Sequence, residues 1–374
     1  MPDPEKRSTM NLKDNNGPSR PTRIDPPGSA APEHSPAAEP THTARHIGRS
    51  TAPLWWTAVA LLVLALPVAG AALLCSGPKK PTCTILQAAV PGVDGGSSIP
   101  VTITLPQDAA GPMPLVAMCH GFTGNRGGDG HFEPIARALA AEGVASAALD
   151  FPASGERSGE PFTEYTLQHM QRDLGTVLTY MQQTYNIDTA SIGLLGHSMG
   201  GRLVTSCLPE GVLPLPVAAA ALWSPANGDG VRGLEFLASP QPDDAARMQE
   251  LEALYETARG QGSVATRWGV EVSCDLFDQL AANPPAEDLL QYRGALMLSY
   301  APAADLTLFS AQTIDATRTA AVQRGLPCYD YTDDFADATH NYDAPDDPQK
   351  DAAIRANIER LTVEFFLRSF GLAG

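Results

Sequence analysis

The sequence predicts a doubly wound, mostly parallel α/β sheet, because short apolar runs alternate along the chain with longer segments of helical periodicity. Each apolar run ends in turn or polar residues. Continuous apolar runs are typical of strands that are buried on both faces of a parallel sheet. On such a sheet the functional site lies beyond the carboxyl ends of the strands, so the loops after these runs are the place to search.

The predicted elements follow in chain order. Apolar runs predict strands over 115–119, 144–149, 191–195, 217–223, 295–300 and 328–331. Two segments between the first three runs have helical spacing. In 131–142 Phe132, Ile135 and Leu139 share one face, and in 163–185 further apolar residues recur in the same way.

The N-terminal part of the chain differs in composition from the rest. Residues 1–50 are rich in Pro, Ser, Thr and Ala and predict a disordered tail. From Leu54 to Cys75 the chain carries no charge, which predicts one transmembrane helix within 51–76, followed by a linker over 77–84. A cleaved signal peptide is the alternative, because residues 69–71 have the A-x-A form. We therefore expect a single-pass membrane protein with its catalytic domain outside the cytoplasm, or a secreted protein after cleavage.

Charge and cysteine content exclude some kinds of partner. The 374 residues contain 25 Lys and Arg against 42 Asp and Glu, a formal net charge of −17 that is concentrated after the tail. Such a domain repels nucleic acid. The 6 cysteines show no zinc-type pairing, and we expect neither a metal nor a cofactor. Cys119 and Cys207 fall in predicted elements and should be buried, and a disulfide among Cys83, Cys274 and Cys328 stays open.

The pentapeptide Gly196-His197-Ser198-Met199-Gly200 follows the run 191–195 directly. A serine on a sharp strand-to-helix turn needs small neighbours, which the two glycines supply. If Ser198 is a nucleophile, it also needs a base, a group that orients the base, and donors for an oxyanion. The backbone N–H groups of Met199 and of Phe122, which follows His120-Gly121 after an earlier strand, are the candidate donors.

The acid and the base are expected after the nucleophile, in that order. Asp305 follows the predicted strand 295–300 by five residues, and His340 lies in the loop after the last predicted strand. Other acids in this part of the chain are alternatives to Asp305, namely Asp315, Asp333, Asp334 and Asp337.

Two longer stretches carry a family resemblance. Residues 120–166, which begin HGFTGNRGGDGHF, and 191–204, SIGLLGHSMGGRLV, resemble the α/β-hydrolase superfamily. They look most like its bacterial cinnamoyl/feruloyl esterase and serine-aminopeptidase-like branch, which includes monoacylglycerol-lipase-like hydrolases. The resemblance covers about 85–374. It implies an α/β-hydrolase domain with Ser198 as nucleophile, Asp305 as acid, His340 as base, and an oxyanion hole at Phe122 and Met199.

The chain departs from the family pattern at several positions. Ala153 stands where the family usually has Gly, Arg157 stands where it has Ser, and Ala301-Pro302-Ala303-Ala304 precedes Asp305 in place of the usual H-G pair. The resemblance implies a serine hydrolase that cleaves carboxylic esters through an acyl-enzyme. A peptidase or lipase with the same triad is an alternative. An inactive binding module, in which Asp305 does not reach His340, is another.

A stretch within the predicted domain, about 227–292, interrupts the alternation of strands and helices. Residues 243–258 predict an amphipathic helix, and 268–280 contain a short apolar alternation. We interpret the stretch as a lid over the site, with a peripheral excursion as the alternative. Four acids would make the mouth of the site negative and favour small neutral esters, namely Asp229, Glu235, Asp275 and Asp278.

Overall fold

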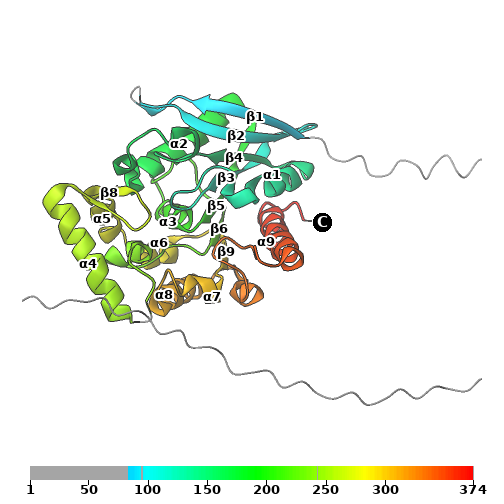
Figure 1. Cartoon of the computed structure of the whole chain (residues 1–374). Coiled ribbons are helices and arrows are strands. Elements are labelled where there is room, and N and C mark those ends of the chain that lie inside the picture. Colours follow the sequence, from blue (N-terminus) through cyan, green and yellow to red (C-terminus); the bar gives the residue numbers. More distant parts are fainter. Residues whose placement is uncertain (1–82, 94–95, 242, 374) are drawn as a thin grey trace, which may run out of the picture. The chain divides into compact units, whose positions relative to one another are not determined.

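The computed structural model describes residues 83–93, 96–241 and 243–373, which form a sheet with helices on both faces (Figure 1). The strands are β1 Cys83–Val90, β2 Ile99–Pro106, β3 Met113–Cys119, β4 Ala145–Leu149, β5 Ile187–His197, β6 Ala219–Trp223, β7 Ser263–Ala265, β8 Glu271–Ser273, β9 Ala295–Ser299 and β10 Cys328–Asp330. The helices are α1 Phe132–Ala141, α2 Leu167–Thr184, α3 Met199–Ser206, α4 Asp244–Gln261, α5 Cys274–Ala281, α6 Pro285–Gln291, α7 Pro302–Asp305, α8 Ala311–Gln323 and α9 Pro348–Ser369.

The main sheet has eight strands in the order β1-β2-β4-β3-β5-β6-β9-β10. The pairs from β4 through β10 are parallel, whereas β2 pairs antiparallel with both β1 and β4. The predicted mostly parallel α/β sheet is therefore confirmed. The antiparallel β1 and β2 were not predicted, and β1 begins at Cys83, two residues before the predicted domain boundary.

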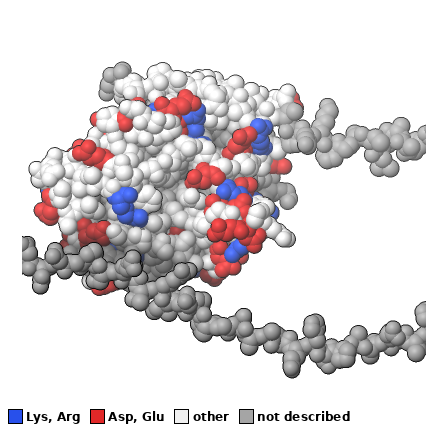
Figure 2. Space-filling view, viewed as in Figure 1, with Lys and Arg blue, Asp and Glu red and all other residues white. Residues whose placement is uncertain are grey.

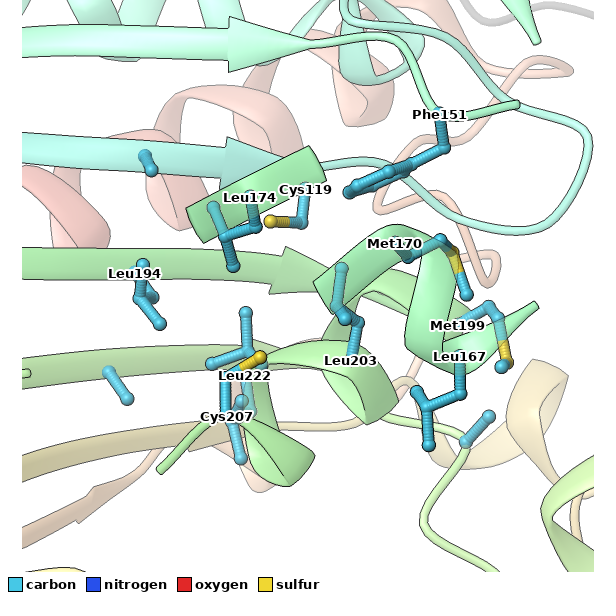
Figure 3. Close-up of a cluster of buried hydrophobic side chains, with 14 of the residues drawn as sticks. Cys119, Phe151, Leu167, Met170, Leu174, Leu194, Met199, Leu203, Cys207 and Leu222 are labelled. Carbon is cyan, nitrogen blue, oxygen red and sulfur yellow. The ribbon is translucent and has the colours of Figure 1, made fainter. Parts of the chain in front are cut away.

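Alternate residues of the strands pack against different helices. Leu115, Ala117 and Cys119 of β3 belong to the cluster that includes apolar residues of α2 and α3 (Figure 3). Val116 and Met118 belong to the cluster that includes residues of α1 and α9. Burial on both faces explains why the strands appear in the sequence as continuous apolar runs.

The register of the sheet brings several loops together at its carboxyl edge. Cys119, the last residue of β3, lies beside Gly196 of β5, and His197 lies beside Trp223 of β6. Trp223 in turn lies beside Ser299, the last residue of β9. The residues that follow these strands are therefore neighbours in space although they are far apart in the sequence.

The insertion between β6 and β9 contains α4, the β7-β8 hairpin, α5 and α6. The predicted helix over 243–258 is confirmed by α4, whose buried residues include Leu251, Tyr255 and Ala258. The apolar alternation over 268–280 forms a strand only at β8. Leu276, Phe277 and Leu280 are buried on one face of α5, since their spacing matches a helical turn better than a strand.

Acidic side chains predominate over basic ones on the face shown in Figure 2, in keeping with the net charge of −17. Cys119 and Cys207 are buried as predicted, and the five described cysteines are all unpaired, so the disulfide that the sequence left open does not form among them. The predicted tail, 1–50, and membrane segment, 51–76, lie outside the described residues. Among the helices that are described, none is both long and apolar enough to cross a membrane.

Candidate active site

Ser198 lies at the turn between β5 and α3, where its backbone has φ 55° and ψ −116°. A positive φ is strained for a residue with a side chain, and such strain is typical of functional sites. The turn closes because Gly196 and Gly200 have no side chains. A Cβ on Gly200 would lie 2.5 Å from the carbonyl oxygen of His120, and one on Gly196 would collide with the Gly200 carbonyl. The expected need for small neighbours is confirmed.

The loop after β3 is held by the buried imidazole of His120. Its Nδ1 lies 2.8 Å from the Gly121 carbonyl oxygen, and its Nε2 accepts a hydrogen bond of 3.2 Å from the Phe151 backbone N–H. Nδ1 therefore carries the proton, and burial lowers the pKa of His120 to about 4. The Gly124 N–H also donates to the Gly121 carbonyl, at 3.0 Å.

This arrangement fixes the direction of one of the candidate oxyanion donors. The C=O and N–H of a trans peptide point in opposite directions, so fixing the Gly121 carbonyl toward His120 turns the Phe122 N–H away from it. Phe122 lines the same pocket as Ser198. Neither the Phe122 nor the Met199 backbone N–H donates a hydrogen bond to another described residue, so both remain available for a developing negative charge.

Asp305 and His340 are brought together from separate loops. Asp305, the last residue of α7, is fully buried, and its Oδ1 lies 2.6 Å from His340 Nδ1. Its Oδ2 accepts hydrogen bonds of 2.6 Å from both Ser224 Oγ and the Ala301 backbone N–H. No other carboxylate in the described chain forms an ion pair with His340, which distinguishes Asp305 from the four alternative acids.

A connected set of hydroxyl groups supports Asp305. Tyr342 Oη lies 3.1 Å from Ser224 Oγ and donates a hydrogen bond of 3.1 Å to Ser299 Oγ. Burial raises the pKa of Tyr342, so the phenol keeps its proton. Ser224, Ser299 and Tyr342 were not predicted as members of the site. Ser299 ends β9 and Ser224 directly follows β6. Their places at the carboxyl ends of strands could have identified them as site residues.

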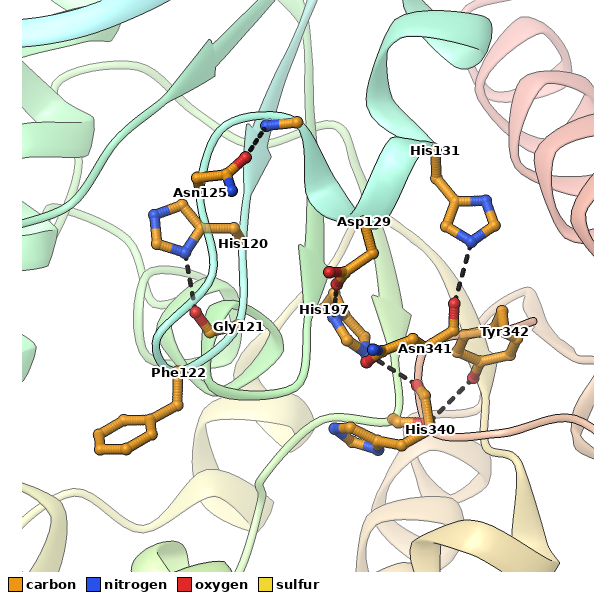
Figure 4. Close-up of polar contacts among 12 residues, drawn as sticks. His120, Gly121, Phe122, Asn125, Asp129, His131, His197, His340, Asn341 and Tyr342 are labelled. Carbon is orange, nitrogen blue, oxygen red and sulfur yellow. Dashed lines mark hydrogen bonds and ion pairs between the residues drawn. The ribbon is translucent and has the colours of Figure 1, made fainter. Parts of the chain in front are cut away.

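Two further histidines hold the loop that carries His340 (Figure 4). His197 Nε2 lies 2.9 Å from the His340 carbonyl oxygen, and His131 Nε2 lies 2.9 Å from the Asn341 carbonyl oxygen. Burial, followed by the proximity of His340, lowers the pKa of His197 to about 3. His197 is therefore a neutral donor that positions the loop.

Ser198 and His340 line one pocket, with a cavity volume of about 320 Å³. No hydrogen bond joins the two side chains, and in hydrolases of this kind such bonds often tighten only when substrate binds. The insertion contributes Phe236 and Trp268 to the wall, where both contact Phe122 edge-on with ring centroids 5.1 and 6.2 Å apart. A larger cavity of about 750 Å³ lies over α2 and contains none of the predicted site residues.

The charge of the pocket comes from a different acid than expected. None of the four acids of the insertion lines the pocket, and Glu235 is buried. The carboxylate that does line it is Asp129, in the loop after β3. Within the described ranges, no group of three or more histidine, cysteine, aspartate or glutamate side chains is placed to bind a metal ion.

Comparisons with known proteins agree with this fold. Residues 110–275 match the family model described as serine aminopeptidase, S33. Over 86 residues the chain is 30% identical to protein phosphatase methylesterase 1 of Schizosaccharomyces pombe, a match that covers 22% of this chain and 25% of that protein. The chain thus spans about a quarter of that curated relative.

Solved structures of esterases and peptidases share the fold. Est1E from Butyrivibrio proteoclasticus is 15% identical, with a TM-score of 0.53 over 77% of this chain and 99% of that one. The acylaminoacyl peptidase of Pyrococcus horikoshii is 13% identical, with a TM-score of 0.55 over 77% of this chain and 42% of that one. At these identities the likeness shows the fold alone. The resemblance in the sequence is confirmed: residues 110–275 match the serine aminopeptidase S33 family model, and the chain has the α/β-hydrolase fold.

Proposed function

We propose that this chain is a serine hydrolase that cleaves carboxylic esters, with Ser198, His340 and Asp305 as its catalytic triad. The observation that carries the proposal is the 2.6 Å contact between His340 Nδ1 and buried Asp305, beside a pocket that also holds Ser198 on a strained turn. The contact argues against an inactive binding module, since that alternative required Asp305 to lie out of reach.

Each group has a defined role in the proposed reaction. His340 Nε2 takes the proton of Ser198 as Oγ attacks the carbonyl carbon, and Asp305 keeps the other proton on Nδ1. The Phe122 and Met199 N–H groups stabilise the oxyanion. His340 then protonates the leaving alcohol, and water, activated by the same imidazole, hydrolyses the acyl-enzyme and releases the acid.

The pocket favours small esters that carry no negative charge. Its wall includes Phe122, Phe236, Trp268 and Leu308, and Asp129 is the acidic member. A volume of about 320 Å³ suits a short acyl or alcohol group. An anionic group would meet the Asp129 carboxylate without a compensating cation.

Covalent labelling of the full-length chain tests the proposed nucleophile. A fluorophosphonate probe is expected to label the wild-type protein, and Ser198→Ala is expected to abolish both labelling and turnover of a short p-nitrophenyl ester. Ser158→Ala, at an exposed serine outside the pocket, is the matched control. Labelling that persists in the Ser198 variant would remove this serine from the mechanism.

A peptidase is the second candidate, because the matching family model is described as serine aminopeptidase. The same triad acts on esters and amides, so the substrate decides between them. Turnover of short p-nitrophenyl esters, aminoacyl anilides and long-chain glycerides by one preparation separates an esterase from a peptidase or a lipase. Faster turnover of anilides than of esters would replace the esterase proposal.

We further propose that the apolar stretch from Leu54 to Cys75 anchors the domain to a membrane, with the domain outside the cytoplasm. The full-length chain is then expected to stay in the membrane pellet after alkaline carbonate washing, whereas a chain without residues 1–76 is released. A mature N-terminus close to residue 71 would instead support the secreted alternative.

A further inference from the structure

Asp129 is a pocket residue that the proposed chemistry does not use. It lines the cavity that holds Ser198 and His340, and its side chain is 46% exposed. One carboxylate oxygen, Oδ2, lies 4.0 Å from His197 Nδ1 (Figure 4). The acid is therefore accessible to a substrate in the pocket.

The backbone around Asp129 holds this carboxylate in a strained conformation. Gly128, Asp129 and Gly130 have consecutive positive φ values of 52°, 54° and 90°. Glycine adopts this conformation without a steric penalty, and aspartate is one of the few other residues that tolerate it. An aspartate between two such glycines is a backbone outlier in the pocket wall, and outliers of this kind cluster at binding and catalytic sites.

The Asp129 carboxylate has no cationic partner within the described part of the chain. His197 is neutral, because burial lowers its pKa to about 3, so the 4.0 Å contact is not an ion pair. Arg355 donates to the Asp129 backbone carbonyl at 2.9 Å, and its guanidinium is paired with two other carboxylates, Asp343 and Asp351. No lysine or arginine lines the pocket.

The position of Asp129 indicates which part of the substrate it faces. Asp129 contacts His197, and the ring of His197 lies 4.9 Å from that of His340, so one residue separates the carboxylate from the imidazole that would protonate the leaving group. In Figure 4 Phe122 lies to the left of Asp129 and His340, and its aromatic contacts are Phe236 and Trp268. The pocket thus has an apolar wall and a separate acidic wall beside the proton donor.

We propose that Asp129 binds a positively charged group, such as an ammonium, on the leaving-group part of the substrate. This inference rests on the proposed function, because it assumes that His340 protonates the leaving alcohol. A carboxylate without a counter-ion attracts a cation in the partly desolvated pocket more strongly than it would in water.

A pair of isosteric esters tests the proposal with the full-length protein. Butyrylcholine and 3,3-dimethylbutyl butyrate differ only in a quaternary nitrogen that is replaced by carbon. We expect kcat/KM for the wild type to be about 3- to 10-fold higher for the cationic ester at low salt, because one charge pair is made. Asp129→Asn keeps the shape and the tolerance of positive φ, and it is expected to bring the ratio to about 1. A general loss of activity cancels in this ratio.

Three controls keep the proposal open to refutation. Asp275→Asn removes one exposed negative charge from the insertion outside the pocket, and it is expected to keep the wild-type ratio. If Asp129→Asn does not fold, Asp129→Gly, which adopts the positive φ freely, takes its place and is also expected to bring the ratio to about 1. A matched pair of ethyl esters, with the trimethylammonio or tert-butyl group at the end of the acyl chain, is expected to show no preference for the cation.

The outcomes distinguish this inference from the proposed function. Turnover of both butyrates with a wild-type ratio near 1, or an unchanged ratio in Asp129→Asn, overturns the inference and leaves the esterase intact. A cation preference that appears only with the acyl-side pair overturns the placement on the leaving-group side. Failure of both butyrates together with failure of fluorophosphonate labelling overturns the proposed function itself.

Discussion

The two halves of the candidate site are built in different ways. The Ser198 half consists of residues 120–124 and 196–201, and glycines allow its backbone segments to approach closely. The His340 half consists of Asp305, His340 and the side chains that hold them, chiefly Ser224 and Tyr342. One half depends on the absence of side chains, and the other depends on hydrogen bonds between them.

This difference determines how each half responds to substitution. Where two backbone segments lie closer than a methyl group allows, any side chain forces the backbone to move. The loss of activity is then nearly complete. Where several hydrogen bonds converge on one carboxylate, removal of a single bond weakens the arrangement by a limited amount. We therefore expect abrupt losses in the Ser198 half and graded losses from the residues that support Asp305 in the His340 half.

Gly200→Ala tests the abrupt case. The new Cβ would lie 2.5 Å from the His120 carbonyl oxygen and closer still to that of Cys119, and both are backbone atoms. We expect a loss of about 3 kcal/mol or more in the free energy of unfolding and no measurable ester hydrolysis. Urea unfolding and turnover of a short ester measure the two effects.

Gly260→Ala is the matched control for that substitution. Gly260 lies in α4, and no heavy atom beyond the adjacent backbone of that helix would lie within 4 Å of its Cβ. This variant is expected to keep full activity and to gain up to about 1 kcal/mol, because alanine favours a helix. A Gly200→Ala protein with wild-type stability and activity would contradict the tight backbone approach.

Asp305→Asn tests the central contact of the His340 half. The amide can donate a hydrogen bond to His340 Nδ1 and so favour the wrong tautomer of the imidazole, as the general behaviour of such triads indicates. We expect kcat to fall about 10⁴-fold, with a small change in KM. Asp333→Asn, at an exposed aspartate that the sequence left as an alternative acid, is expected to keep kcat. A fall of less than 10-fold in the Asp305 variant would argue against its proposed role.

The same difference explains what the sequence could predict. The Ser198 half is made from contiguous residues, so its glycines and its serine appear together as motifs. The strand-to-helix turn was predicted from these motifs. Asp305 and His340 were predicted from their order after the strands, because strand ends meet at one edge of a sheet. Their support could not be predicted in this way, since Ser224 and Tyr342 are 118 residues apart in the sequence.

The insertion shows a second limit of prediction. Its acidic residues predicted a negatively charged entrance to the pocket, but the sequence does not say which of these side chains face the pocket. Glu235 is buried, whereas Asp129, outside the insertion, supplies the charge. The helical turn of α5 was also missed, because a short apolar stretch fits a strand and a helix almost equally well.

Acid is expected to weaken both halves, because each contains a buried histidine that is held neutral. His120 orients the loop of the Ser198 half and His197 orients the His340 loop, with pKa values lowered to about 4 and about 3. In the unfolded chain both histidines have the ordinary pKa of about 6.5. Below that pH the unfolded chain therefore binds more protons than the folded chain. The stabilisation is complete above about pH 6.5 and is lost as the pH falls toward 4.

The slope of this loss is the quantity to measure. Each histidine contributes up to about 1.4 kcal/mol per pH unit to the fall in unfolding free energy. Urea unfolding between pH 6 and pH 5 is expected to show a shallower slope in His120→Asn and in His197→Asn, by about 1 kcal/mol per pH unit each. Equal slopes in the wild type and both variants would mean that these histidines are not held neutral.

The smallest effect we expect comes from the hydroxyl groups behind Asp305, and it tests whether the His340 half acts as a connected network. Ser224→Ala removes a direct hydrogen bond to Asp305 and should lower kcat about 10-fold, whereas Tyr342→Phe acts only through its neighbours and should lower it about 3-fold. If Tyr342 acts through Ser224, kcat of the double variant falls no further than kcat of Ser224→Ala alone. The double-mutant cycle then gives a coupling free energy of about 0.5 kcal/mol or more. Additive losses in kcat would instead mean that the two hydroxyls support the site independently. A cycle of the same size in unfolding free energy but not in kcat would assign the network to stability, so both quantities are to be measured on the same four proteins.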